Sequence, residues 1–211
     1  MADTGTAGTA SQIALPLTAG QGSPGRIVIG NANEAAAAAL ADPAAWPFGT
    51  AILTGPPRSG KSLLARWFTA TGRGEAIDDA PLLPEDALFH HWNRAQASGT
   101  RLLIVGGVPP WTIALPDLAS RMGAALQLAI TQPDDVMAAD LIGAHAAQRG
   151  LPLGAEAAAY LVPRTGRSFA VLERLVAEID RLSLERKAPA TQTVWRAALE
   201  AVMGPEEPRL L

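Results

Sequence analysis

Residues 50–67 of this chain read TAILTGPPRSGKSLLARW, and this stretch decides the fold. It opens with a short apolar run, Thr50 to Thr54, of the kind found in strands that are buried on both faces of a parallel sheet. The two glycines, Lys61 and Ser62 then match the G-x4-G-K-S phosphate-binding loop, the P-loop. Leu63 and the residues after it continue with helical spacing. A strand that turns through this loop into a helix predicts an α/β domain with a nucleotide site.

The residue types of the loop have a chemical reason. Glycines let backbone N–H groups turn inward around phosphate oxygens, and the start of the following helix adds positive potential. Lys61 can reach the β- and γ-phosphates, and the Ser62 hydroxyl can bind Mg²⁺. The alternative is a glycine-rich turn with a chance Lys-Ser pair. The predicted nucleotide-binding residues are Gly55, Pro56, Pro57, Arg58, Ser59, Gly60, Lys61, Ser62 and Leu63, with Gly30 at the base of the site.

A P-loop site needs an acidic group on a neighbouring strand to hold Mg²⁺. Asp78 and Asp79 follow Ile77 and are the best candidates. We expect Asp78 to hold the ion through water and Asp79 to orient the attacking water, with Ser62 as the third metal-site residue. The alternative is that the two acids lie in a loop. Residues 73–75 are poor strand formers, which weakens the prediction of a strand before the acids.

Hydrophobic spacing along the chain predicts an α/β part followed by an all-helical part. The expected strands are 50–54, 75–79, 101–105 and 126–130, and the expected helices are 33–40, 62–71, 85–97, 115–122, 134–149, 154–161, 167–187 and 191–203. We therefore expect a three-layer parallel sheet of about four strands, followed by a small all-α domain. The expected segments are a tail over 1–25, a P-loop α/β domain over 26–131, a helical domain over 132–204 and a tail over 205–211.

Composition limits the class of protein. Of 211 residues, 48% are apolar, enough to form a core, and the net charge of −3 leaves no broad positive surface for DNA. The absence of cysteine excludes disulfides and thiolate metal sites. No apolar run reaches the roughly 18 residues that span a bilayer, and residues 1–11 lack the pattern of a signal peptide. We expect a cytoplasmic protein without a membrane partner.

A short apolar peptide, residues 12–17, lies between a small polar tail and a Gly/Ser/Pro stretch. Pro16 favours an extended chain, whose alternate side chains can enter a shallow apolar groove on a partner. The alternative is a first strand or a strap that packs on the chain's own domain. The predicted contact residues are Gln12, Ile13, Leu15, Pro16 and Leu17.

Several motifs together resemble the Hda/DnaA-like AAA+ family. The most similar stretch is LPDLASR at 115–121. The other matching segments are LFH at 88–90, NR at 93–94, Gly99, LLI at 102–104, PP at 109–110, and the lid-like PDD at 133–135 and RS at 167–168. Peptide 12–17 resembles the segment by which Hda docks on the DNA sliding clamp. The resemblance covers most of residues 12–203.

The resemblance implies a regulatory function in replication initiation. Regulators of the Hda type dock on the sliding clamp (the β subunit) of DNA polymerase III and present an arginine finger to ATP-loaded DnaA, which stimulates hydrolysis. Arg121 matches the finger position, where a guanidinium supplied in trans stabilises charge on the transferring phosphoryl group. The alternative for Arg121 is a surface salt bridge at a helix end. The implied ligands are ADP or ATP with Mg²⁺, and the implied partners are DnaA and the clamp, without sequence-specific DNA binding.

The sequence departs from the family at three places. The strand through Val105 should end in a polar residue that senses the γ-phosphate, but Val105, Gly106 and Gly107 carry no polar side chain. Val171 occupies the position of the lid's sensor arginine, with Arg174 one turn away. The short gap before Ile77 lacks an edge strand and helix. We therefore expect a structural ADP or ATP ligand and negligible ATPase activity of the chain itself.

Other functions stay open at this point. The chain could be an autonomous ATPase, a clamp-binding adaptor that needs no nucleotide, or an anchoring subunit for other cargo, and self-association is undecided. The missing polar sensors argue against the autonomous ATPase. Glu85 and Glu173 are expected on solvated helix faces, and His90 and His91 at the surface or the edge of the core.

Overall fold

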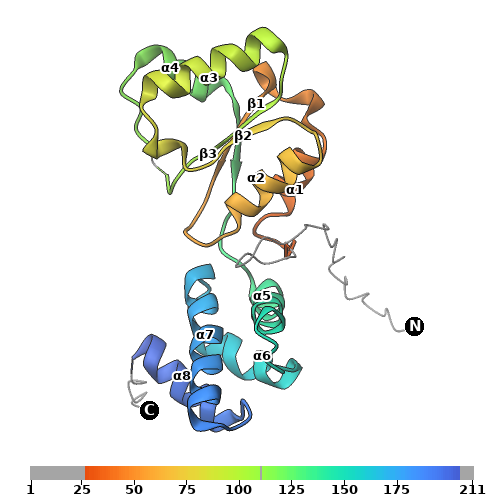
Figure 1. Cartoon of the computed structure of the whole chain (residues 1–211), viewed down its shortest axis with the longest axis vertical. Helices are drawn as coiled ribbons and strands as arrows, with labels where there is room; N and C mark the ends of the chain where they lie inside the picture. Colours follow the sequence, from red (N-terminus) through yellow and green to blue (C-terminus); the bar gives the residue numbers. More distant parts are fainter. Residues whose placement is uncertain (1–26, 110, 205–211) are drawn as a thin grey trace, which may run out of the picture.

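Four short strands form one parallel sheet (Figure 1). They are β1 (Thr50–Thr54), β2 (Glu75–Ile77), β3 (Leu102–Val105) and β4 (Leu126–Ala129). Their order across the sheet is β2-β3-β1-β4, and Ile52 of β1 pairs with Ile104 of β3 and Gln127 of β4. The computed structural model describes residues 27–109 and 111–204, so peptide 12–17 and the segment 205–211 lie outside the described residues. The sheet confirms the expected α/β class with four strands.

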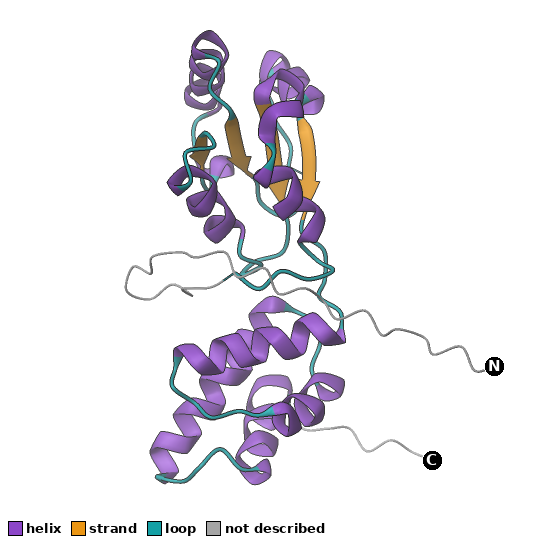
Figure 2. Ribbon diagram, turned by 90° about the vertical axis from the view of Figure 1, so that its right-hand side faces the viewer, coloured by secondary structure: helices purple, strands orange, loops and turns teal. Residues whose placement is uncertain are grey.

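Helices cover both faces of the sheet and make three layers (Figure 2). They are α1 (Glu34–Ala41), α2 (Lys61–Ala70), α3 (Glu85–Ser98) and α4 (Pro116–Ala124). Alternate side chains of a strand point to opposite faces. Leu53 and Leu103 therefore pack with α1 and α2, while Ile52 and Ile104 pack with α3 and α4.

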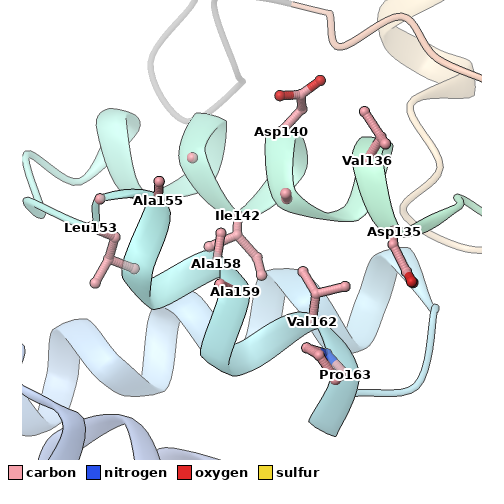
Figure 3. A pocket seen from close by; sticks show the side chains of 13 residues that line it. Asp135, Val136, Asp140, Ile142, Leu153, Ala155, Ala158, Ala159, Val162 and Pro163 are labelled. Carbon is pink, nitrogen blue, oxygen red and sulfur yellow. The ribbon is translucent and has the colours of Figure 1, made fainter. Parts of the chain in front are cut away.

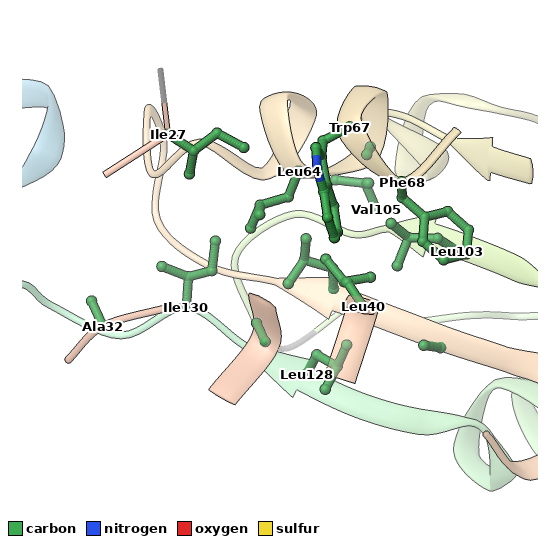
Figure 4. Packing of buried hydrophobic residues seen from close by; sticks show 14 of the residues in the cluster. Ile27, Ala32, Leu40, Leu64, Trp67, Phe68, Leu103, Val105, Leu128 and Ile130 are labelled. Atoms are coloured by element: carbon green, nitrogen blue, oxygen red, sulfur yellow. The ribbon is translucent and has the colours of Figure 1, made fainter. Parts of the chain in front are cut away.

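The core cluster beneath α1 and α2 is the larger of the two in the sheet domain (Figure 4). Trp46 stacks on Phe68 with ring centroids 5.2 Å apart, and its indole N–H donates to the carbonyl of Ala39 at 3.0 Å. This satisfied donor lets the large ring be buried at little cost. Short 3-10 turns connect the elements: η1 (Pro43–Ala45), η2 (Pro47–Gly49) and η3 (Ala80–Leu82).

Strand β2 is shorter than the sequence predicted. It ends at Ile77, whereas the expected strand ran to Asp79. Asp79 has a φ of +48°, a left-handed conformation that breaks a strand. The chain between α2 and β2 spans only residues 71–74, which leaves β2 at the edge of the sheet, as expected from the missing strand and helix.

The second half of the described chain is all-helical. Its elements are α5 (Asp135–Gln148), α6 (Ala155–Leu161), η4 (Val162–Arg164), α7 (Phe169–Arg186) and α8 (Gln192–Met203). Apolar residues of α7 recur every three or four positions and are buried: Leu172, Leu175, Val176, Ile179 and Leu182. The Asp134 carboxylate caps α5 by accepting from the N–H of Met137 at 2.8 Å. None of the described helices is both long and apolar enough to cross a bilayer.

Residues 27–33 precede α1 and contact residues 131–134, which lead from the sheet domain into the helical domain. The amide side chain of Asn33 fixes this segment by accepting from the N–H of Gly30 at 3.0 Å. A Cβ at Gly30 would lie 2.9 Å from the side chain of Met137, so α5 packs directly on this backbone. Met137 and Phe169 also belong to the core cluster beneath α1 and α2. The helical domain thus packs at the carboxyl edge of the sheet, where the P-loop lies.

Candidate functional site

The P-loop joins the end of β1 to the start of α2. Gly60 has a φ of +88°, which only glycine adopts without strain, and it directly precedes Lys61, the first residue of α2. A Cβ at Gly55 would lie 2.8 Å from Ile130, so the loop passes close to the end of β4. These backbone requirements explain why the motif needs its two glycines.

The ammonium group of Lys61 lies inside the loop. It donates to the carbonyls of Gly55 and Pro56, each at 2.9 Å. Burial lowers the pKa of Lys61, while the negative charges of Asp78 and Asp79 act in the opposite direction. The two acids at the end of β2 therefore share one electrostatic site with the P-loop lysine.

The donor set fits a nucleotide phosphate with Mg²⁺. The hydroxyl of Ser59 is buried and has no hydrogen-bond partner among the described residues, which is the state of a group that awaits a ligand or water. The described part of the chain holds no cluster of three or more metal-binding side chains. Mg²⁺ at nucleotide sites uses few protein ligands beside phosphate and water, so Ser62, with Asp78 acting through water, would suffice to hold it.

Arg58 of the P-loop forms a bidentate ion pair with Glu173 on α7. Its Nε and Nη2 groups donate to the two carboxylate oxygens. The hydrogen bond from Arg58 lowers the pKa of Glu173. Nearby on α5, burial lowers the pKa of His145. The sequence predicted a solvated helix face for Glu173, but its carboxylate bridges the P-loop and the helical domain.

The end of β3, where the expected polar sensor is missing, lies beside the same loop. The N–H of Gly106 donates to the carbonyl of Leu53 at 2.9 Å, and the N–H of Gly55 contacts the carbonyl of Gly107 at 3.4 Å. These contacts bring the end of β3 beside the P-loop with backbone groups only. Arg174, the possible substitute for the lid arginine, instead donates to the carbonyl of Val202 on α8 at 3.3 Å.

Arg121 lies near the end of α4 and is held by α3. Its Nη1 group donates to the side-chain oxygen of Asn93 at 2.8 Å. Its guanidinium lies 4.2 Å from the ring centroid of Trp92 and 4.6 Å from that of Phe89. A cation stacked on two rings with one hydrogen bond is restrained in orientation. These contacts differ from the surface salt bridge that was the alternative.

Arg121 and the P-loop lie at opposite ends of the strands, the P-loop at the carboxyl end and Arg121 at the amino end. The P-loop follows Thr54, which pairs with Ala129, the last residue of β4. Arg121 instead precedes Leu126, the first residue of β4. Because β1 and β4 are parallel, Arg121 lies at the end of the strands away from this chain's own P-loop. Figure 1 shows α4 at the end of the sheet domain that faces away from α5.

Glu85 makes a further polar contact that the sequence did not predict. The carboxylate of Glu85 accepts from the N–H groups of Ala114 and Leu115, at 2.8 and 2.6 Å, and so holds the start of α4. Glu85 was expected on a solvated helix face; it is half-buried, and its carboxylate has these two partners. The sequence carries no signal for this contact, because the partners lie about 30 positions apart in an irregular segment.

The fold and the site define a P-loop module of the AAA+ class with a helical lid. Domain III of the replication initiation protein DnaA from Thermotoga maritima is similar, with a TM-score of 0.70 over 85% of this chain and 95% of that chain at 14% identity. The structure of DnaA bound to AMPPCP and single-stranded DNA has a TM-score of 0.57, covering 76% of this chain and 66% of that chain at 16% identity. The FIGL-1 AAA domain in complex with ADP has a TM-score of 0.51, covering 78% of this chain and 74% of that chain at 15% identity. At these identities the likeness shows the fold alone.

The match to a family model falls on the helical domain. Residues 135–192 match the family model described as Hda, lid domain, which covers α5, α6 and α7. A comparison with curated proteins finds no match. The lid match confirms the resemblance to Hda that the sequence motifs indicated, and the likeness to DnaA domain III confirms the expected AAA+ fold.

Proposed function

We propose that this chain is an Hda-type regulator of replication initiation, which docks on the DNA sliding clamp and promotes hydrolysis of DnaA-bound ATP. The lid match, the P-loop and the clamp-like peptide 12–17 support this function. The observation that carries it is the position of Arg121 at the end of the strands away from its own P-loop. A guanidinium at that end can serve a nucleotide in another molecule.

In this mechanism Arg121 supplies charge to the partner's reaction. A guanidinium has five N–H donors, and the bond to Asn93 uses one of them. Trp92 and Phe89 restrain its plane, so little side-chain entropy is lost when it meets the γ-phosphate. An arginine finger supplied in trans contributes about 10³–10⁵ in rate in the GTPase cases.

The chain's own nucleotide has a structural role in this proposal. The P-loop amides and Lys61 hold the phosphates, and Ser62 with Asp78 holds Mg²⁺, which neutralises phosphate charge when bound. Asp79 remains the candidate to orient water, but residues 105–107 offer no polar side chain near the γ-phosphate. The isolated protein therefore binds ADP or ATP and hydrolyses ATP negligibly, which a phosphate-release assay measures.

The decisive experiment measures hydrolysis of DnaA-bound ATP in the presence of clamp loaded on DNA. We expect the wild-type chain to stimulate hydrolysis and Arg121→Ala to lose at least about 100-fold of the stimulated rate, since a finger is worth 10³ or more. Arg121→Lys keeps the positive charge but not the planar guanidinium, so it should recover only a small part of the stimulated rate. Arg186→Ala, at the exposed end of α7, is the matched control.

Three outcomes separate the alternatives. Equal stimulation by wild type and Arg121→Ala contradicts the trans arginine finger. Full stimulation by Lys61→Ala, with folding and clamp binding unchanged, supports an adaptor that needs no nucleotide. Phosphate release by the chain alone at rates typical of AAA+ enzymes supports the autonomous ATPase instead.

A further inference from the structure

The lid carries an open apolar groove between α5 and α6 (Figure 3). It has a volume of about 630 Å³, and apolar side chains line it: Val136, Ile142, Leu153, Ala158, Val162 and Pro163. Val136 is 59% exposed. An apolar groove of this size resembles the surfaces that bind short apolar peptides rather than an ordinary exposed helix face.

The chain leading to peptide 12–17 begins close to this groove. The described residues start at Ile27, which belongs to the same core cluster as Met137 of α5. Val136 and Ala139 of the groove flank Met137 on the same helix. Residues 18–26 can span up to about 30 Å when extended, while α5 with its 14 residues is about 21 Å long. The end of the groove beside Val136 is therefore within reach of peptide 12–17.

The chemistry of the peptide matches the groove. Ile13, Leu15 and Leu17 alternate, so an extended backbone presents all three on one side. The groove is apolar inside and has Asp135 and Asp140 at its rim. Peptide 12–17 carries no acidic residue that these two carboxylates would repel.

We propose that peptide 12–17 docks in the α5–α6 groove of its own lid when no clamp is bound. A tethered peptide has an effective concentration on the order of millimolar, so weak affinity suffices to populate the docked state. The groove and the clamp then compete for the same apolar side chains. The competition rests on the proposed clamp binding, whereas docking itself does not.

Cross-linking of the full-length chain tests docking directly. The chain has no cysteine, so the double variant Thr18→Cys/Ala159→Cys places one thiol beside the peptide and one in the groove. Thr18→Cys/Ala201→Cys is the matched control, since Ala201 is exposed on α8 and does not line the groove. With a short bismaleimide we expect intramolecular cross-linking several-fold faster for the Ala159 pair. Equal rates for both pairs overturn the proposal, and predominant cross-linked dimers overturn it in favour of a second copy in the groove.

Filling the groove tests the competition. A Cβ at Gly143 meets no atom within 4 Å, so Gly143→Leu adds a side chain to the groove without a clash, and Gly143→Ala is the control for the helix. If the peptide is docked in about three-quarters of molecules, freeing it tightens apparent clamp binding about fourfold. We expect Gly143→Leu to bind clamp more tightly than Gly143→Ala and to lose the Ala159 cross-link. Unchanged clamp affinity and cross-linking overturn the proposal. If wild type binds no clamp while the specific cross-link forms, the proposed function fails and docking stands.

Discussion

At the residue scale, nucleotide binding must replace the hydrogen bonds that Lys61 makes in this structure. Its ammonium group donates to two carbonyls of its own loop, and a phosphate has to replace them. A hydrogen bond to a charged group contributes about 1.5–3 kcal/mol, so Lys61→Ala should weaken ADP binding by about 10- to 100-fold. Isothermal titration with ADP and Mg²⁺ measures this, with Arg186→Ala as control. An unchanged dissociation constant would mean that Lys61 does not contact phosphate.

The residues of the candidate site differ in how far the sequence could predict them. Lys61 and its loop follow a local motif, because adjacent backbone groups must surround one phosphate. Glu173 pairs with Arg58 across 115 positions, and the periodicity of α7 only indicates which of its faces is buried. Long-range ion pairs depend on how two domains pack, and no local pattern encodes that packing.

At the scale of elements, the edge strand β2 depends on a close approach of two backbones. A Cβ at Gly74 would lie 2.2 Å from the carbonyl oxygen of Arg101 and 2.8 Å from the ring of Phe68. Because a backbone carbonyl in a sheet cannot move aside, Gly74→Ala should lower the free energy of unfolding by about 1–3 kcal/mol. Urea denaturation followed by circular dichroism measures the loss.

Gly123→Ala provides the matched control for this prediction. Gly123 lies within α4, and a Cβ there meets no atom within 4 Å. The same substitution should raise stability by about 0.5–1 kcal/mol, because alanine favours a helix over glycine. Equal effects of both substitutions on the free energy of unfolding would show that crowding near β2 is not the reason why position 74 requires glycine.

Most elements could be predicted from hydrophobic spacing, for a physical reason. The strands of a parallel sheet are buried on both faces and appear as short apolar runs, while helices repeat every three or four residues. The prediction failed at Asp78 and Asp79, where the strand was expected to continue. There the chain turns through the left-handed residue Asp79 into η3, which contains Pro81. Aspartate and proline are both turn residues, and the strand prediction did not use this signal.

At the scale of the whole molecule, two kinds of contact join the lid to the sheet domain. Met137 and Phe169 enter the core cluster beneath α1 and α2, and Arg58 pairs with Glu173 beside the P-loop. The apolar contacts supply most of the stability, because Arg58 is 63% exposed and a pair of this kind contributes about 0–1 kcal/mol. The ion pair instead links the position of the lid to the conformation of the phosphate loop.

Stability should therefore depend on pH through His145, which lies near Glu173, Arg149 and Arg58. Burial lowers the pKa of His145 below its ordinary 6.5, so the unfolded chain takes up a proton first as the pH falls below that value, and stability decreases. The pKa of Glu173 is lowered from 4.5, so its contribution stays constant above about pH 5.5. Between about pH 7.5 and 5.5, wild type should lose more unfolding free energy in urea than His145→Gln. Equal losses in the two proteins would show that the charge on His145 is not excluded from the folded lid.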